Sequence, residues 1–359
     1  MTHITFYLRK ILNCIAKVFT STITPLSSPQ LLADGPPPPP FPCRLQTHPF
    51  IQNQPTRQTL PPLPHRALAL WLLYSLLNFI KFHFNVCNRF FSSFTSLLFY
   101  LPCSQLMLKA NKERKQVEKK SCDVDLVTET DKEVERTLVN GLKQAFPNHN
   151  FIGEEAVSLG GKCELLGEPT WIIDPVDGTM NFVHSFPHSA ISIALYFEKA
   201  PVIAIIYNPF MNQMFTARKG KGSFLNGEPI HVSKETELCK ALVMAESGTS
   251  RDPEKLKVVL ANLTHLTPIV HGIRTLGSAA LNMAMVASGG ADINYEFGIH
   301  AWDTAAGKLL VEEAGGVCID PAGGEFNVMS RRVLCASTME LAQEIVVLEM
   351  YSLPRARGV

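Results

Sequence analysis

The chain has 359 residues and a formal net charge of +1, which is enough for two domains or for one large domain with an extension. Residues 1–105 hold eight Lys/Arg and one acidic residue, whereas the remainder holds 25 basic and 31 acidic residues, and this mildly acidic main part argues against a nucleic-acid-binding protein. The nine cysteines are odd in number and lack C-x-x-C spacing, so they give no zinc motif and favour a reducing, cytoplasmic location.

The first 105 residues are predicted to be an extension without a recognised domain. They hold 14 of the 25 prolines and 11 of the 21 phenylalanines. Prolines at this density block helix interiors and central strands, so we expect this part to be poorly ordered. Its apolar run Ala67–Ile80 ends at Lys81 and falls short of the ~20 apolar residues that a bilayer span needs, and extending it to Leu101 would include Lys81, His83 and Arg89. A membrane anchor there stays open as an alternative.

Alternating helix and strand patterns begin near Leu106. Lys109–Lys120 is charged and helix-prone, and apolar residues recur close to the helical period across Thr128–Phe146. The pattern predicts further strands at Phe151-Ile152, Trp171–Ile173, Ala190–Phe197, Val202–Tyr207 and Met214–Ala217, and helices at Pro253–Leu263, Ala279–Ala287 and Trp302–Ala314. This order predicts a layered α/β or α+β domain over residues 106–352, followed by a tail at 353–359.

The most informative stretch is W-I-I-D-P-V-D-G-T-M-N-F-V-H (171–184). An apolar strand leads into Asp174 and Asp177, which are followed by Gly178 and Thr179. Carboxylates supply the oxygen ligands that Mg²⁺ prefers, and free N–H groups at a helix start bind anions. The stretch therefore favours a metal site beside a phosphate. An Asx turn that ends a strand is the alternative for this stretch taken alone.

Acidic residues in the same local setting recur at Asp131, at Glu154-Glu155 and at Asp303. Each one taken alone is explained by stabilisation of a helix start. Together they lie where strands end and helices begin, and such positions converge on one edge of a layered fold, where ligands bind. Several carboxylates cannot crowd together unless cations neutralise them. We therefore expect two or three Mg²⁺ ions per subunit.

Four stretches resemble the inositol monophosphatase family: V-D-L-V-T-E-T-D (124–131), F-I-G-E-E (151–155), the stretch at 171–184, and G-I-H-A-W-D-T-A-A-G (298–307). They occur in the order that the family uses, and the resemblance runs from about Val117 to near Leu348. It implies the αβαβα sandwich of the sugar-phosphatase fold and a homodimer. It also implies Mg²⁺-dependent, lithium-inhibited hydrolysis of myo-inositol monophosphates to inositol and inorganic phosphate by a metal-activated water.

The resemblance also implies a set of metal ligands. Glu154 and Asp174 bind the first ion together with the carbonyl of Val176. Asp174, Asp177 and Asp303 hold the second ion. A third, weaker ion depends on Glu154 and waters.

Catalytic and substrate-binding roles follow from the same resemblance. The Thr179 hydroxyl, oriented by Asp131, helps Glu154 and the first ion to activate water. The residues placed around the substrate are Asp177, Gly178, Thr179, Gly277, Ser278, Ala279, Glu296 and Asp303.

Two features depart from the family. Met180 stands where the family has threonine, which removes a hydroxyl beside the phosphate-binding turn. The family's long first amphipathic helix has no counterpart before Leu106. These departures leave open a catalytically impaired, membrane-associated paralogue.

Other activities compete with inositol monophosphate hydrolysis as interpretations of the sequence. A related sugar phosphatase or nucleotide 3′-phosphatase stays open, although Glu296 and the run through Trp302 favour inositol. A triad of Ser189, His184 or His188, and Asp174 lacks the G-x-S-x-G context of such sites. The basic run 218–221 is typical of a solvated turn.

Overall fold

The computed structural model describes residues 103–112, 117–119 and 126–347, all within one compact unit, Phe90–Val359. Residues 1–102 of the predicted extension, including the apolar stretch at 67–101, and the predicted tail at 353–359 lie outside the described residues. Among the described helices, none has both the length and the apolar character that a membrane crossing requires.

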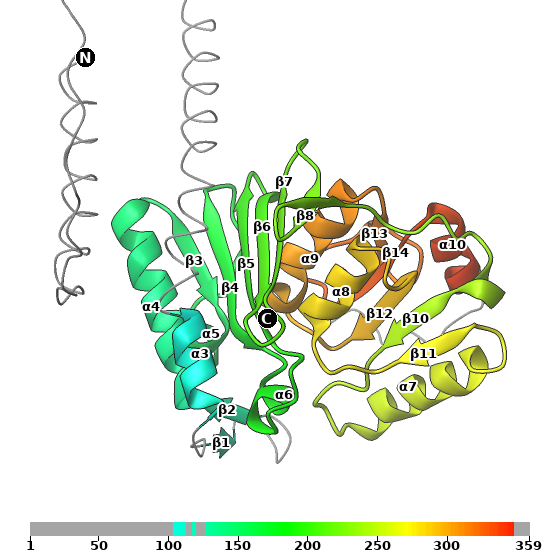
Figure 1. Ribbon diagram of the computed structural model, residues 1–359, viewed down its shortest axis with the longest axis horizontal. Coiled ribbons are helices and arrows are strands. Elements are labelled where there is room, and N and C mark those ends of the chain that lie inside the picture. The colour runs from blue at the N-terminus through cyan, green and yellow to red at the C-terminus, as the bar shows by residue number, and fades with distance from the viewer. Residues whose placement is uncertain (1–102, 113–116, 120–125, 348–359) are drawn as a thin grey trace, which may run out of the picture. The chain divides into compact units, whose positions relative to one another are not determined.

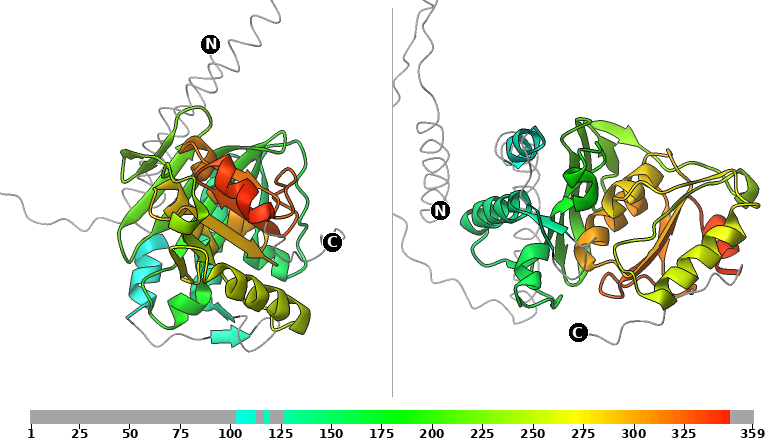
Figure 2. Two further views of the ribbon diagram at one scale, coloured as in Figure 1. Left: turned by 90° about the vertical axis from the view of Figure 1, so that its right-hand side faces the viewer. Right: turned by 90° about the horizontal axis from the view of Figure 1, so that it is seen from below.

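Five layers alternate between helices and sheets, which confirms the predicted αβαβα sandwich (Figure 1). The outer layers contain α3 (Ser104–Ala110) and α4 (Glu129–Ala145) on one side, and α7 (Pro253–Leu266) and α10 (Met339–Val347) on the other. Between the two sheets lie α8 (Ala279–Ala287) and α9 (Ala301–Glu313), as the view from below also shows (Figure 2).

The larger sheet has seven strands in the order β3-β4-β5-β6-β7-β8-β9. Only β3 and β4 are parallel, and every other neighbouring pair is antiparallel. The bounds are β3 (Asn150–Gly153), β4 (Thr170–Asp177), β5 (Ala190–Phe197), β6 (Ala200–Asn208), β7 (Gln213–Arg218), β8 (Ser223–Leu225) and β9 (Glu228–Ile230).

The smaller sheet has the order β11-β10-β12-β14-β13, in which β11, β10 and β12 are parallel and β14 is antiparallel to both of its neighbours. The bounds are β10 (Leu242–Ala245), β11 (Gly272–Arg274), β12 (Ile293–Phe297), β13 (Val317–Ile319) and β14 (Arg332–Ala336). Short helices are α5 (Glu154–Ser158), α6 (Thr179–Val183) and the 3₁₀ turn η2 (Leu238–Lys240).

Strand alternation divides the core of the larger sheet between its two faces. Ile191 and Ile193 of β5 pack in a cluster with residues of α4, whereas Ala190 and Ala194 belong to the cluster that holds α8 and α9. Small side chains on the inner face let these two helices approach the sheet closely. The helices also approach each other, because a Cβ on Gly307 of α9 would lie 2.5 Å from the sulfur of Met283. These contacts fix the middle layer.

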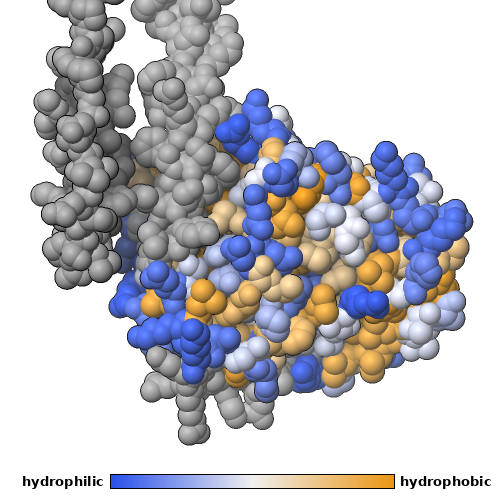
Figure 3. Space-filling view, viewed as in Figure 1, coloured by the Kyte–Doolittle hydropathy of each residue, from blue (hydrophilic) through white to orange (hydrophobic). Residues whose placement is uncertain are grey.

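Helix α4 follows its sequence pattern. Val134, Leu138 and Leu142 recur at helical spacing and are buried against the sheet. The surface around α4 that is visible in Figure 3 is mostly hydrophilic. A capping box joins the backbone and side chains of Thr128 and Asp131 at its start. The helix begins one residue after its predicted start and ends one residue before its predicted end.

The helix expected over Lys109–Lys120 is confirmed only at Lys109 and Ala110 and is wrong for the other described residues of that range. Helix α3 ends at Ala110, and residues 117–119 form β1 (Val117–Lys119). This strand pairs antiparallel with β2 (Leu126–Thr128), with Val117 opposite Thr128. Pairing with a second segment overrides the weak local preference of charged residues for helix.

Candidate active site

A register shift in β4 brings two acids to one side of the sheet. Asp174 and Asp177 are three residues apart, so regular alternation would direct them to opposite faces. The pairing of β4 with β5 shifts between these two residues, and the N–H of Val176 donates to Asp174 Oδ1 at 3.0 Å. Irregularities of this kind re-aim side chains next to active sites.

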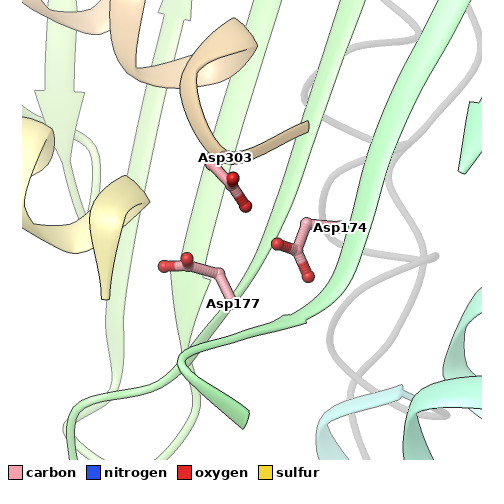
Figure 4. A group of neighbouring side chains, drawn as sticks. All are labelled: Asp174, Asp177 and Asp303. Atoms are coloured by element: carbon pink, nitrogen blue, oxygen red, sulfur yellow. The ribbon is translucent and has the colours of Figure 1, made fainter. Parts of the chain in front are cut away.

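A third acid comes from the middle layer. Asp303 lies in the first turn of α9, and oxygens of Asp174, Asp177 and Asp303 lie within 4.8 Å of one another. The three side chains surround one space (Figure 4). The backbone N–H of His300 donates to Asp303 Oδ2 at 2.6 Å and fixes its orientation. The site therefore joins the larger sheet to the helices beneath it.

Burial and mutual repulsion raise the pKa values of these carboxyl groups. Burial and the charge of Asp303 raise the pKa of Asp177 to about 8. The hydrogen bonds from Ser278 and from the N–H of Ala280 lower this pKa and only partly offset the rise. The pKa of Asp303 rises to about 7, mainly through burial and then through Glu154. The pKa of Asp174 also lies well above its usual value. A divalent cation with oxygen ligands would relieve this repulsion, so the donor set suits Mg²⁺.

Glu154 stands at the first position of α5, and its charge raises the pKa values of Asp174 and Asp303. The start of α5 is held by Glu135 of α4, which accepts from the N–H groups of Glu155 at 2.8 Å and Ala156 at 2.9 Å. A carboxylate at a helix start stabilises the unpaired N–H groups there. Glu135 thus positions Glu154, a role that its place in the α4 pattern did not reveal.

The side chains of Asp131 and Thr179 meet beside the carboxylate cluster. Thr179 Oγ1 lies 3.2 Å from Asp131 Oδ1 and 3.0 Å from the carbonyl oxygen of Val176. The other oxygen of Asp131 accepts from the N–H of Thr128 at 2.9 Å and from its hydroxyl. Asp131 is fully buried, so its position is fixed by these bonds. This geometry can orient the Thr179 hydroxyl.

Gly178 makes the turn from β4 into α6. Its φ of 81° lies in the left-handed region, and a Cβ would lie 2.9 Å from the Gly277 carbonyl oxygen and 3.0 Å from that of His188. Only glycine suits this position. The first N–H groups of a helix have no partner within it, so the turn can bind an anion beside the carboxylates.

The loop before α8 and the first turn of that helix are hydrogen-bonded to Asp177 of the carboxylate cluster. The Ser278 hydroxyl and the N–H of Ala280 both donate to Asp177, the latter at 3.1 Å. The amide of Asn181 in α6 donates to the carbonyl of Leu276 at 2.6 Å. The predicted residues Gly277, Ser278 and Ala279 therefore lie next to Asp177.

Glu246 fixes the same loop from the other side, and sequence reasoning missed it. Its Oε1 accepts from the N–H groups of Leu276 and Gly277, each at 2.7 Å, and from Asn282 Nδ2 at 2.9 Å. Glu246 directly follows the apolar strand β10. An acid after an apolar strand is the signal that identified Asp174, and it was available here too.

Glu296 lies in β12 and is 5 % exposed. Its Oε2 has no hydrogen-bond partner among the described residues. Burial raises its pKa well above the usual value, as do the charges of Glu246, Asp303 and Asp177, whereas Lys255 lowers it. The predicted substrate residue is therefore within electrostatic range of the carboxylate cluster.

The two competing motifs do not assemble. The buried hydroxyl of Ser189 has no hydrogen-bond partner among the described residues, so no serine nucleophile is activated there. The basic run 218–221 enters a turn whose N–H groups at Gly220 and Lys221 donate to Glu313 at 2.7 and 3.0 Å.

The sequence matches known proteins over most of the described residues. Residues 101–349 match the model of the inositol monophosphatase family. Inositol monophosphatase 1 of Homo sapiens is 48% identical over 242 residues, which cover 67% of this chain and 87% of the relative. Inositol monophosphatase 2 of Homo sapiens is 46% identical over 246 residues, which cover 68% and 85%.

Solved structures show the same fold. The inositol monophosphatase of Thermotoga maritima aligns with a TM-score of 0.61 and 33% identity, covering 68% of this chain and 91% of that one. The extragenic suppressor protein suhB of Bartonella henselae aligns with a TM-score of 0.63 and 30% identity, covering 70% and 95%.

Proposed function

The chain belongs to the inositol monophosphatase family and is a phosphoric monoester hydrolase, and we propose that it hydrolyses myo-inositol monophosphates to inositol and inorganic phosphate with Mg²⁺. The main support for this proposal is the group of three carboxylates, whose oxygens lie within 4.8 Å of one another beside the turn at Gly178. Raised pKa values at these groups support the need for a bound cation.

Two to three Mg²⁺ ions per subunit would be held by Glu154, the Val176 carbonyl and the three clustered aspartates. When bound, Mg²⁺ supplies a water of lowered pKa and neutralises charge on the phosphate oxygens. The fit of the donor set supports this assignment, since hard cations of this kind prefer carboxylate and carbonyl oxygens.

The protein's own groups bind and orient the substrate. The N–H groups of Gly178 and Thr179 hold phosphate oxygens at the start of α6. The Thr179 hydroxyl, held by Asp131, accepts a hydrogen bond from the attacking water and sets its direction. Because the phosphate ester is cleaved by water in line with the leaving alcohol, positioning supplies much of the rate.

The polyol end of the substrate lies toward Glu296 and the loop at 277–279. The unpartnered oxygen of Glu296 accepts from a substrate hydroxyl. Glu246 keeps the loop in place through the N–H groups of Leu276 and Gly277. A site with buried polar groups of this kind rejects ligands that lack the matching hydroxyls.

Phosphate release by the full chain tests the proposal. We expect turnover of myo-inositol 1-phosphate with Mg²⁺, none after EDTA treatment, and inhibition by Li⁺. Fructose 1,6-bisphosphate and 3′-phosphoadenosine 5′-phosphate are the comparison substrates. Preference for either of them, or turnover that survives EDTA, would overturn the assignment. No turnover of any substrate at saturating Mg²⁺ would support the impaired paralogue, for which vesicle partitioning of the full chain is the companion measurement.

A nucleotide phosphatase is the second candidate. The solved SaIMPase-II with bound 2′AMP aligns with a TM-score of 0.55 and 25% identity, covering 62% of this chain and 83% of that one. A nucleotide monophosphate therefore belongs in the same substrate comparison.

Assembly and location are also proposals. We infer a homodimer, which analytical ultracentrifugation measures, and a cytoplasmic location. All five described cysteines are free, including Cys318 and Cys335, which lie opposite each other on β13 and β14. Free thiols are compatible with a reducing compartment.

A further inference from the structure

Lys255 is a buried cation without a partner. It lies in α7 and is only 5 % exposed. Within the described part of the chain, its Nζ forms no hydrogen bond or ion pair. Lysine is almost never buried unless its charge is paired, because desolvation of an ammonium group is costly. A ligand that reaches Nζ would remove this cost.

The ammonium group lies at the edge of the smaller sheet that carries the substrate residues. A Cβ on Gly248 would lie 2.6 Å from Lys255 Nζ, and one on Gly298 would lie 2.9 Å from it. These two glycines follow the carboxyl ends of β10 and β12, which are parallel neighbours. Ligands bind at this edge in open α/β sheets. The two glycines therefore leave room for the ammonium group beside Glu296.

Lys255 and Glu296 act on each other without touching. Lys255 lowers the otherwise raised pKa of Glu296, and Glu296 opposes the lowering of the pKa of Lys255 by burial. They form no ion pair, and Oε2 of Glu296 has no hydrogen-bond donor among the described residues. One acceptor and one donor thus remain unsatisfied at the same end of the site.

We propose that Lys255 is a specificity-determining residue that donates hydrogen bonds to hydroxyl oxygens of the substrate's polyol ring. A hydroxyl both donates and accepts, so hydroxyls on one ring can satisfy Glu296 and Lys255 together. A ligand with a second anionic group would be repelled by the charge of Glu296. A ligand with an apolar ring would leave both Glu296 and Lys255 without a hydrogen-bond partner. This inference rests on the proposed function and extends it to a residue of α7.

The test compares two ligands that share a six-membered ring. We measure kcat and KM for myo-inositol 1-phosphate, and Ki for cyclohexyl phosphate, which lacks the ring hydroxyls, as a competitor of that reaction. Lys255→Met should lower kcat/KM for the inositol substrate by about 10-fold through KM, the loss expected for a hydrogen bond to a charged group. The Ki of cyclohexyl phosphate should not change. Lys257→Met, at an exposed lysine of the same helix, is the control and should change neither value.

A merely structural role predicts something different. If Lys255 only supports the fold, Lys255→Met weakens both ligands alike or lowers kcat, and the inference is overturned. An unchanged KM overturns it too. Thermal melting identifies a variant that does not fold. If Lys255→Met does not fold, Lys255→Gln replaces it in the test, because glutamine keeps a neutral hydrogen-bond donor. Its KM should then lie between that of the unmodified protein and the roughly 10-fold higher value expected for Lys255→Met.

The failure of the proposed function is distinguishable from this result. If the unmodified chain turns over no inositol phosphate, the proposed function fails. If it prefers myo-inositol 1-phosphate over cyclohexyl phosphate and Lys255→Met keeps that preference unchanged, only the role of Lys255 fails.

Discussion

Thr179 and Asp131 are 48 residues apart in the chain, yet Thr179 Oγ1 lies 3.2 Å from Asp131 Oδ1. The contact joins the start of α6 to the first turn of α4, across the edge of the larger sheet. Asp131 Oδ2 also accepts two hydrogen bonds from Thr128, which fix the orientation of the carboxylate toward the Thr179 hydroxyl.

Replacing Thr179 by alanine should therefore lower kcat roughly 100-fold, the lower end of what a positioned proton-handling group contributes. Thr179→Ser keeps the hydroxyl and should retain most of the activity. Mg²⁺ affinity, measured by calorimetry, should change little in either variant. Full activity of the alanine variant would show that the hydroxyl takes no part in orienting water.

Asp174→Asn should abolish turnover, with a loss on the order of 10³-fold, because it removes a charge shared by the whole cluster. The same change should raise the melting temperature of the metal-free protein, since it removes repulsion at a buried carboxylate whose pKa is already raised. Stabilisation by added Mg²⁺ should disappear.

Asp320→Asn provides the matched control for that melting experiment. Asp320 is equally buried, but it forms an ion pair with Arg332 at 2.8 Å. Removing one partner of a buried pair leaves an uncompensated charge, so this variant should melt at a lower temperature. Differential scanning fluorimetry in EDTA should show a higher melting temperature for Asp174→Asn and a lower one for Asp320→Asn than for the unmodified protein. Shifts of equal sign would contradict the electrostatic account of the cluster.

The stability of the metal-free protein should depend on pH. The pKa values of Asp177 and Asp303 are about 8 and about 7, above the value of an unfolded aspartate. Folding raises both, so their stabilising contribution is complete below the unfolded pKa and is lost as pH rises through the folded values. The free energy of unfolding in EDTA should fall from about pH 4, near the unfolded pKa of aspartate, to about pH 8 and then level off.

Mg²⁺ should suppress this dependence, because bound cations keep the carboxylates ionised. Urea titrations across the same pH range, with EDTA and with Mg²⁺, measure both curves. An EDTA curve that stays level over this range would contradict the raised pKa values.

Glu246→Leu should raise KM about 10-fold and destabilise the fold by about 1–3 kcal/mol, because the part-buried N–H groups of Leu276 and Gly277 and the buried amide of Asn282 lose their acceptor. Glu246→Gln keeps an acceptor oxygen and should be close to the unmodified protein. Steady-state kinetics and urea unfolding separate the two variants. Equal losses in both would assign the effect to the charge of Glu246 instead of its hydrogen bonds.

The layered fold and the core of the candidate site could be predicted because both depend on local patterns. Strand β5 and helix α8 have the bounds that their apolar runs predicted. Asp174, Asp177 and Asp303 come together because strand ends and helix starts meet at one edge. The metal ligand roles themselves stay predictions.

Long-range contacts could not be predicted in the same way. The bonds from Glu246 reach residues 30 and more positions away, and those of Glu135 reach the start of α5. The sequence predicted a helix over Pro253–Leu263 but gave no sign that Lys255 is buried, because its burial depends on the packing of α7 near the ends of two strands. The strand β1 was missed because its partner, and not its own composition, decides its conformation.

The tight contact between Gly307 and Met283 bears on far more than packing. Asp303 belongs to the same helix as Gly307, whereas Asp174 and Asp177 belong to the sheet that this helix rests on. The spacing of α9 from α8 therefore affects how far Asp303 lies from the two acids of the sheet. A methyl group added at Gly307 would push α9 away from α8, and it would displace Asp303, about one helical turn away, relative to Asp174 and Asp177.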